Sequence, residues 1–248
     1  MSWTSSWSRG RARDMHDVHV RQHIIERVLA RRGKVHWFDS LDPARTAFVV
    51  IDMQETFCEP GSPAEVPTSR GIVQPINDLS RELRERGMPV IWVLHANTHH
   101  GGVSDWEGFF NHVVSDDVRN RTIESLEPGR QRVWQELEAA SSDITVIKNR
   151  YSALIPGSSS LERILRNLGV DTLLIGGTKT NVCCESTARD AMMLDFKVVM
   201  VEDCCAALSD EEHRSALETF IQQFGDVMTS REVLERLGCD ATAVTRDI

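Results

Sequence analysis

The residue whose surroundings most favour chemistry in this sequence is a cysteine at position 183. It follows an apolar run from Leu173 to Ile175, a Gly176-Gly177 turn and the stretch Thr178-Lys-Thr-Asn-Val-Cys183, after which helix-favouring residues begin. A cysteine in the first turn of a helix meets unpaired N–H groups and the positive end of the helix dipole, and both favour the thiolate. Cys183 is therefore a candidate nucleophile, although a free cysteine at such a junction is equally often a small buried residue.

Two charged residues stand at the ends of other apolar runs. Asp52 follows the run from residue 46, and Lys148 follows Ile144-Thr-Val-Ile147. Taken singly, a capping role for Asp52 and a surface position for Lys148 are the more common outcomes. Together with Cys183 they suit one reaction, because a cysteine nucleophile needs a base for its proton and a cation that orients the base. Backbone N–H groups at the turn and at Cys183 are placed to hold an oxyanion, so the set indicates acyl transfer.

These residues need a scaffold that brings distant parts of the chain together. The apolar runs predict strands at 46–53, 89–95, 144–147, 173–175, 197–201 and near 227, and helices at 72–87, 131–139, 159–168, 183–194, 210–223 and 231–237. Strands that alternate with helices imply a parallel sheet with helices on both faces. The carboxyl ends of such strands line one crevice, where the three residues can meet. The segment 107–128 has an irregular pattern and is long for a connection, which is typical of a lid or binding loop.

The first part of the chain lies outside this alternation. Residues 1–14 have no periodicity and are interpreted as a flexible lead, and apolar residues at helical spacing predict an amphipathic helix over 16–32. We predict an N-terminal extension over residues 1–43 and a single α/β domain over residues 44–240. The extra helix packs either on that domain or on a neighbouring subunit, and the pattern leaves both open.

Composition narrows the class of protein. The chain has 248 residues, a formal net charge of −9 and six cysteines without the spacing of a zinc site. The negative charge argues against a nucleic-acid partner, and no run is long and apolar enough for a membrane span or a signal peptide. The cysteine pattern suggests neither a disulfide framework nor a zinc knuckle. We therefore expect a cytoplasmic protein that handles small molecules.

Three motifs in order give the chain a family resemblance. Val49-Val-Ile-Asp-Met-Gln54, Lys148 after a strand, and the stretch from Gly177 to Asp190 with Thr-Asn-Val-Cys at its centre resemble the isochorismatase-like cysteine hydrolases. The resemblance covers roughly residues 44–230. It implies a six-stranded parallel sheet flanked by helices, a triad of Asp52, Lys148 and Cys183, and a cis peptide bond between Thr178 and Lys179. It also implies an oxyanion hole made by the backbone N–H groups of Lys179 and Cys183.

Within that family the chain is most similar to the ureidoacrylate amidohydrolase group. The likeness is carried by Lys148-Asn-Arg-Tyr-Ser152 and by Thr180-Asn-Val-Cys-Cys-Glu-Ser-Thr187. It implies substrate-binding roles for Gln54, Asn97 and Tyr151. The implied reaction is hydrolysis of a linear amide, ureido or carbamoyl C–N bond through a thioester, on a ureidoacrylate-, biuret- or related urea-derivative-type substrate.

The departures from the family bear on cofactors. Metal-binding nicotinamidases of the family carry an Asp-x-His pair after the second strand, whereas this chain has His95, Asn97, His99 and His100 there. We therefore expect no metal and no cofactor. The family likeness also suggests a homo-oligomer. Vinyl-ether hydrolysis of isochorismate and a non-catalytic protein that keeps the fold remain the alternatives.

Other notable residues are assigned to packing or to helix ends. Cys184 is expected to point away from the crevice, and Cys204 and Cys205 to be buried thiols. Glu185 and Arg189 have the spacing of an ion pair on a helix, and Glu202 or Asp203 could cap a neighbouring helix.

Overall fold

The computed structural model describes residues 16–101 and 103–238, and its centre is a parallel β-sheet. The strand order is β5-β2-β1-β6-β7-β8, and each neighbouring pair runs parallel. The strands are β1 (Thr46–Ile51), β2 (Val90–His95), β5 (Ile144–Lys148), β6 (Thr172–Thr178), β7 (Lys197–Ala206) and β8 (Asp226–Met228). The predicted six-stranded parallel sheet is confirmed.

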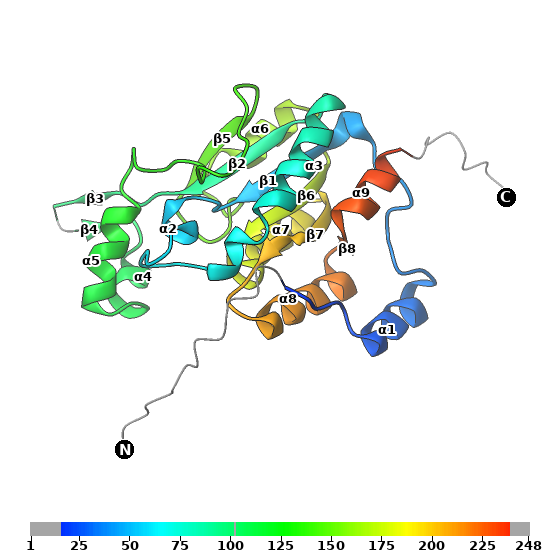
Figure 1. The fold of residues 1–248 in the computed structure, drawn as a ribbon, viewed down its shortest axis with the longest axis horizontal. Coiled ribbons are helices and arrows are strands. Elements are labelled where there is room, and N and C mark those ends of the chain that lie inside the picture. The colour runs from blue at the N-terminus through cyan, green and yellow to red at the C-terminus, as the bar shows by residue number, and fades with distance from the viewer. Residues whose placement is uncertain (1–15, 102, 239–248) are drawn as a thin grey trace, which may run out of the picture.

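Helices cover both faces of the sheet because its central strands are apolar on both sides (Figure 1). In β1, Val49 and Ile51 face one apolar core, and Phe48 and Val50 face the other. The first core is closed by α6 (Leu161–Asn167), α7 (Glu185–Met193) and α8 (Asp210–Gln223). The second is closed by α3 (Val73–Glu85) and α9 (Ser230–Leu237). A continuous apolar run is the pattern of a strand that is buried on both faces.

Strands β1 and β6 approach each other most closely at Gly177. This glycine has a φ of 111°, and a Cβ atom there would lie 2.0 Å from the carbonyl oxygen of Ile51. Only a residue without a side chain fits such a contact and such a φ. The two strand ends that lead to Asp52 and to Cys183 are therefore held side by side.

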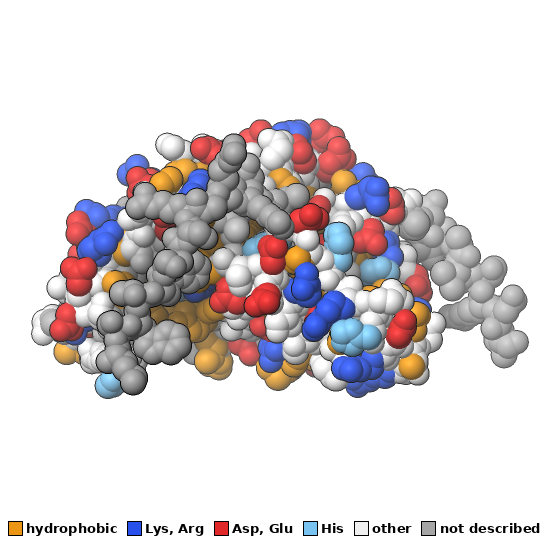
Figure 2. Space-filling view, turned by 60° about the horizontal axis from the view of Figure 1, so that its bottom comes forward, with side chains coloured by type: hydrophobic (Ala, Val, Ile, Leu, Met, Phe, Trp, Pro, Cys, Tyr) orange, Lys and Arg blue, Asp and Glu red, His pale blue; other side chains and the backbone are white. Residues whose placement is uncertain are grey.

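The N-terminal helix packs on the α/β domain. Helix α1 is Gln22–Arg32, so the predicted start at residue 16 was wrong, because residues 16–21 before it form no regular secondary structure. Its Ile24 and Val28 join the core beside α8, and Arg21 forms an ion pair with Glu218 at 2.6 Å. The predicted lead, residues 1–14, lies outside the described residues. Charged and histidine side chains gather on the face that carries α1 and α8 (Figure 2).

The segment after β2 is more ordered than its pattern predicted. A small antiparallel pair, β3 (His99–His100) with β4 (Val103–Ser104), leads into α4 (Glu107–His112) and α5 (Asp116–Ser125). These helices lie with the short helix α2 (Glu55–Cys58) at one end of the molecule (Figure 1). Two short helices separated by a bend have no long periodic stretch, which is why the pattern looked irregular.

The helix predicted at 131–139 is absent, and this prediction was wrong. The chain there runs past the sheet, with a β-bridge between Gln54 and Val133 and a hydrogen bond from Trp134 N to the Met53 carbonyl. Trp134 and Leu137 are buried against the core beneath α3. Their three-residue spacing imitates a helical face, but the burial comes from tertiary contacts.

The remaining short elements connect these layers. They are the 3₁₀ turns Pro43–Arg45 and Pro67–Arg70. No helix among the described residues combines the length and the apolar character that crossing a membrane would require.

Candidate active site

Asp52, Lys148 and Cys183 meet at the carboxyl edge of the sheet. Asp52 follows β1 with a φ of 55°, Lys148 ends β5, and Cys183 lies in the loop after β6. The Lys148 Nζ is 2.9 Å from Asp52 Oδ2, and both side chains are 0% exposed. Cys183 is 5% exposed. The sequence analysis brought these three residues together, and the structure places them in one cluster.

The Lys148 ammonium has an acceptor for each of its three protons. Besides Asp52, it contacts His95 Nδ1 at 3.0 Å and the Arg150 carbonyl at 3.0 Å. His95 is the register partner of Lys148 across β2 and β5, so the two side chains leave the sheet side by side. Burial alone would lower the pKa of Lys148, but the charge of the adjacent Asp52 carboxylate outweighs it, so that the pKa is raised. Lys148 is therefore a fixed cation.

Asp52 is a buried carboxylate with room to accept a proton. Burial raises its pKa, while Lys148 and the neighbouring Cys183 thiol oppose that rise. Apart from the Lys148 ion pair, neither carboxylate oxygen has a well-aligned donor among the described residues. A carboxylate with a raised pKa and an open lone pair beside a thiol can serve as a general base.

Cys183 is a buried cysteine whose surroundings favour the thiol over the thiolate. It lies in a single turn of π-helix, Thr180–Cys184, that precedes α7, and its carbonyl accepts a hydrogen bond from Thr187 Oγ1. Burial and then the Asp52 carboxylate raise the pKa of Cys183, while Lys148 and Lys179 oppose them. A helix start favours the thiolate, as the sequence indicated, but burial and the nearby Asp52 carboxylate act in the opposite direction here.

The loop before the cysteine carries the predicted backbone feature. The peptide bond between Thr178 and Lys179 is cis. Lys179 and Cys183, the two predicted oxyanion-hole residues, both line the cavity beside the thiol.

That cavity has a volume of about 250 Å³ and mostly apolar walls. Trp106 packs on Phe109 and Tyr151 at ring-centroid distances of 4.9 Å and 4.7 Å, and the Arg150 guanidinium lies over the outer part of Trp106. The rest of the lining is Phe57, Pro63, Ala64, His95, Val113, Val114, Val118, Thr122, Leu126, Lys179, Val182 and Cys183.

The predicted substrate-binding residues divide into two kinds. Tyr151 lines the cavity, and burial raises its pKa. Gln54 and Asn97 do not line it. Gln54 bonds both backbone groups of His95, and Asn97 Oδ1 is 2.9 Å from His95 Nε2. Both amides are engaged with protein groups, and the substrate-binding roles of Gln54 and Asn97 stay predictions.

Asp105 is a residue that the sequence analysis missed. Its carboxylate accepts hydrogen bonds from Asn97 Nδ2 at 2.7 Å and from the backbone and hydroxyl of Thr98. Burial raises the pKa of Asp105, but these hydrogen bonds outweigh it and lower the pKa overall. The chain of contacts therefore runs from Asp105 through Asn97 and His95 to Lys148. An acid eight positions after Asn97 gives no sequence signal, because the loop that returns it is not periodic.

The histidines of this loop do not form a metal centre. Within residues 16–101 and 103–238, no group of three or more His, Cys, Asp or Glu side chains is arranged to hold a metal ion. His99 packs edge-on against Phe110, and His95 is bonded at both ring nitrogens.

A second pair of histidines, His16 and His213, packs next to the loop that carries Cys183. His213 Nδ1 is 2.8 Å from Thr180 Oγ1, and its ring stacks on His16 at 4.3 Å. His16 in turn accepts a hydrogen bond from Ala207 N and contacts Asp210 at 2.8 Å. Burial and then His16 lower the pKa of His213 to about 3. The N-terminal segment thereby contacts the cysteine loop through a neutral histidine.

The packing assignments made from the sequence agree with the structure. The Cys184 Sγ contacts the Gly176 carbonyl at 3.7 Å, and Cys204 and Cys205 are buried. Arg189 pairs with Glu185 at 2.5 Å. Asp203 bonds the backbone and hydroxyl of Ser230 at the start of α9, whereas Glu202 contacts His19.

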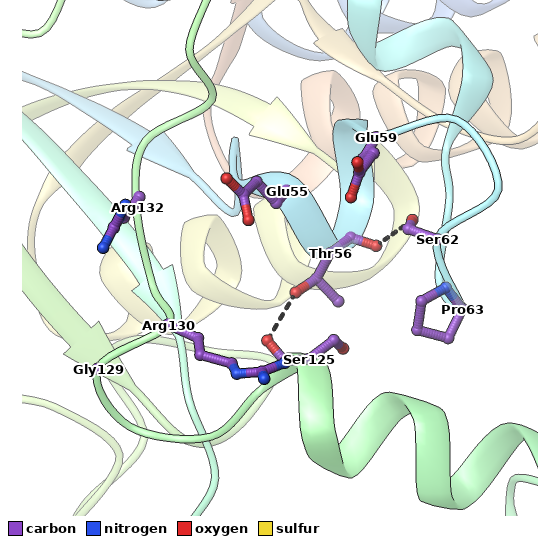
Figure 3. A pocket seen from close by; sticks show the side chains of 9 residues that line it. All are labelled: Glu55, Thr56, Glu59, Ser62, Pro63, Ser125, Gly129, Arg130 and Arg132. Atoms are coloured by element: carbon purple, nitrogen blue, oxygen red, sulfur yellow. Dashed lines mark hydrogen bonds between the residues drawn. The ribbon is translucent and has the colours of Figure 1, made fainter.

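A separate polar hollow of about 290 Å³ lies between α2 and the end of α5 (Figure 3). Glu55 and Glu59 border it from α2, and Arg130 and Arg132 from the chain that follows α5. Thr56 Oγ1 donates to the Ser125 carbonyl across it. Pro63 is shared with the cavity beside Cys183, but the thiol does not face this hollow.

A six-stranded parallel sheet with an aspartate, a lysine and a cysteine at one edge defines an isochorismatase-like α/β protein. Residues 46–232 match the isochorismatase domain, and the chain belongs to the isochorismatase family of hydrolases.

Individual relatives agree with this family assignment. An uncharacterised isochorismatase family protein of Escherichia coli O157:H7, YecD, is 31% identical over 79% of this chain and 98% of its own length. An Arabidopsis thaliana protein that is named as an inactive nicotinamidase is 32% identical over 68% of this chain and 84% of its own. The crystal structure of a cysteine hydrolase from Pseudomonas syringae pv. phaseolicola 1448A is 31% identical, with a TM-score of 0.70 over 80% of this chain and 94% of that one.

Proposed function

We propose that this protein is a cysteine-dependent amidohydrolase that cleaves a linear amide, ureido or carbamoyl C–N bond of a small molecule. The observation that carries the proposal is the buried Asp52–Lys148 ion pair beside the Cys183 thiol. A buried ion pair at this edge costs desolvation free energy, which a purely structural role does not explain. Acyl transfer gives each of the three groups a task.

In the first half of the reaction Cys183 forms an acyl-enzyme. Asp52 takes the thiol proton while the Cys183 sulfur attacks the carbonyl carbon, and the backbone N–H groups of Lys179 and Cys183 stabilise the oxyanion. The protonated Asp52 then gives its proton to the leaving nitrogen, so the C–N bond breaks and ammonia or an amine departs. A thioester remains, and Asp52 is again a carboxylate.

In the second half water regenerates the thiol. Asp52 takes a proton from a water molecule, whose oxygen attacks the thioester carbonyl. The C–S bond breaks, the thiolate takes the proton back from Asp52, and a carboxylic acid or a carbamate leaves. Lys148 stays charged throughout and holds Asp52 in place, because its three protons already have acceptors.

The substrate class rests on similarity and on one residue in the cavity. The segment from Lys148 to Ser152 resembles that of the ureidoacrylate amidohydrolase group, and its Tyr151 faces the cavity. We therefore propose a ureidoacrylate-, biuret- or related urea-derivative-type substrate.

The test is ammonia release from a panel of amides and ureido compounds, with Cys183→Ala and Cys184→Ala compared. The neighbouring Cys184 makes a matched control, because its sulfur is equally buried but contacts the Gly176 carbonyl. We expect turnover to vanish in Cys183→Ala and to persist in Cys184→Ala, and mass spectrometry to trap an acyl group on Cys183. Full turnover in Cys183→Ala would refute the mechanism. Isochorismate would then be tested as a substrate, and its turnover would identify vinyl-ether hydrolysis.

A further inference from the structure

The cavity beside Cys183 has mostly apolar walls and a lysine among its lining residues, and this contrast indicates the chemistry of its ligand. Most of its wall is made of aromatic and branched aliphatic side chains from α4, α5 and the loops beside them. His95 also borders it, but both its ring nitrogens are taken by Lys148 and Asn97. A cavity with such walls binds an apolar group by the area it buries, and it offers few partners to a small polar molecule.

Among the described residues, Lys179 is the one Lys or Arg that lines this cavity. Its side chain is only partly exposed, and it makes no ion pair with any residue in the described part of the chain. No Asp or Glu side chain lines the cavity beside it. A lysine that lines a largely apolar cavity and has no ion-pair partner among the described residues is available to pair with an anion that enters the cavity.

The position of Lys179 relative to the nucleophile is set by the loop. Lys179 and Cys183 belong to the same turn, since the Lys179 carbonyl accepts hydrogen bonds from Val182 N and Cys184 N. The Lys179 charge is also close enough to oppose the rise in the pKa of Cys183. An anionic group bound by this ammonium would therefore lie a short distance from the carbonyl under attack.

We propose that the Lys179 ammonium binds a carboxylate of the substrate, and that the substrate is an amide or ureido compound with an apolar body and one carboxylate. This inference rests on the proposed function and narrows it. It favours carboxylate-bearing compounds with an apolar group as substrates over neutral, polar compounds such as biuret. Biuret has no apolar group that could pack against Trp106 and Phe109.

The first test compares matched substrates that differ in the carboxylate alone. Phthalamate is paired with benzamide, and N-carbamoylphenylalanine with phenethylurea, and kcat/KM is measured for the wild type, Lys179→Met and Lys179→Arg. We expect the wild type to prefer the carboxylate member of at least one pair by about tenfold or more. Lys179→Met should remove most of that preference and Lys179→Arg should keep most of it. Both members of a pair use the same nucleophile, so the ratio of their kcat/KM values is insensitive to any change in Cys183 reactivity.

The second test measures binding without turnover. In the Cys183→Ala protein, titration calorimetry compares cinnamate with cinnamyl alcohol, with and without Lys179→Met. We expect cinnamate to bind about tenfold or more tightly, and the difference to disappear with the lysine.

The outcomes separate the two proposals. Turnover of amides with no preference for the carboxylate member, or a preference that survives in Lys179→Met, would overturn the role of Lys179 and leave the amidohydrolase intact. Absence of all turnover together with lysine-dependent cinnamate binding would refute the amidohydrolase and support the anion site. Equal binding of the two cinnamyl compounds, or binding of neither, would overturn the anion site.

Discussion

Nδ1 of His95 accepts a hydrogen bond from the Lys148 ammonium at 3.0 Å, although both side chains are able to carry a positive charge. Burial and then the Lys148 charge hold the pKa of His95 well below its usual range, so the ring is neutral. Since Nδ1 accepts, the ring proton lies on Nε2, which donates to Asn97 Oδ1. The histidine that ends β2 thus belongs to a polar network that orients Lys148.

We expect His95→Phe to lower kcat by about tenfold or more with a smaller change in KM, because Lys148 loses one of its three acceptors. His95→Gln, whose amide can still accept, should recover part of that loss. Steady-state kinetics on the best substrate of the panel measure both. A loss confined to KM in His95→Phe would show that the ring acts on the substrate and not on the lysine.

The buried ion pair should behave non-additively. Lys148→Met leaves the Asp52 carboxylate buried without its cation, so we expect a loss of about 3–5 kcal/mol in the free energy of unfolding. Adding Asp52→Asn removes the stranded charge, and the double variant should be more stable than Lys148→Met alone. Urea unfolding at neutral pH measures the stability of the wild type, of Lys148→Met and of the double variant. Equal stability of the single and double variants would show that the carboxylate is already protonated in Lys148→Met.

Stability should fall in acid partly through His213. Its pKa in the folded chain is about 3, below the value of about 6.5 expected when unfolded. Between these two values the unfolded chain binds a proton that the folded chain does not, so this group stabilises the fold above about pH 6.5 and the stabilisation is lost as the pH falls toward 3. We expect His213→Gln to flatten the dependence of unfolding free energy on pH by up to about 1.4 kcal/mol per pH unit between pH 6 and 4.

The control for that experiment is His23→Gln, since His23 is an exposed residue of α1. Its curve should have the slope of the wild type. Parallel curves for His213→Gln and the wild type would contradict a buried, neutral His213.

Gly177 should tolerate no side chain. Gly177→Ala would place a Cβ 2.0 Å from the Ile51 carbonyl oxygen, so β1 and β6 would have to separate. We expect a loss of more than about 4 kcal/mol or a failure to fold, judged by thermal unfolding. Gly61→Ala is the matched control, because Gly61 also has a positive φ of 79° but nothing lies within 4 Å of its Cβ position. That control should cost only about 1 kcal/mol. Similar losses at both positions would mean that backbone strain, and not the strand contact, is responsible.

The sheet and the cluster at its edge were predictable because both depend on local patterns. Continuous apolar runs that end in Asp52 or Lys148 indicate buried parallel strands, and the topology of such strands brings their carboxyl ends together. The bounds of α8 and β5 follow from the same periodicities. The family resemblance added the cis bond between Thr178 and Lys179.

What could not be predicted depends on tertiary contacts. The contacts of the Asn97 amide with His95 and Asp105 are one such feature, because no pattern in the chain pairs these residues. The spacing of Trp134 and Leu137 imitates a helix because burial against a sheet and burial along a helix can leave the same pattern. The protonation of Cys183 depends on how deeply the thiol is buried, which a local sequence does not encode.

The wall of the cavity and the edge of the sheet come from different stretches of the chain. Trp106, Phe109 and three valines of the wall, Val113, Val114 and Val118, belong to the segment between β2 and β5, whereas the proton transfers proposed above take place at strand ends. Related proteins could therefore differ in this segment, and so in their substrates, while they share the same catalytic residues. For an engineer, residues 106–126 are the stretch to randomise when a different molecule is to be hydrolysed, because Asn97 and Asp105 before it hold His95 and through it Lys148.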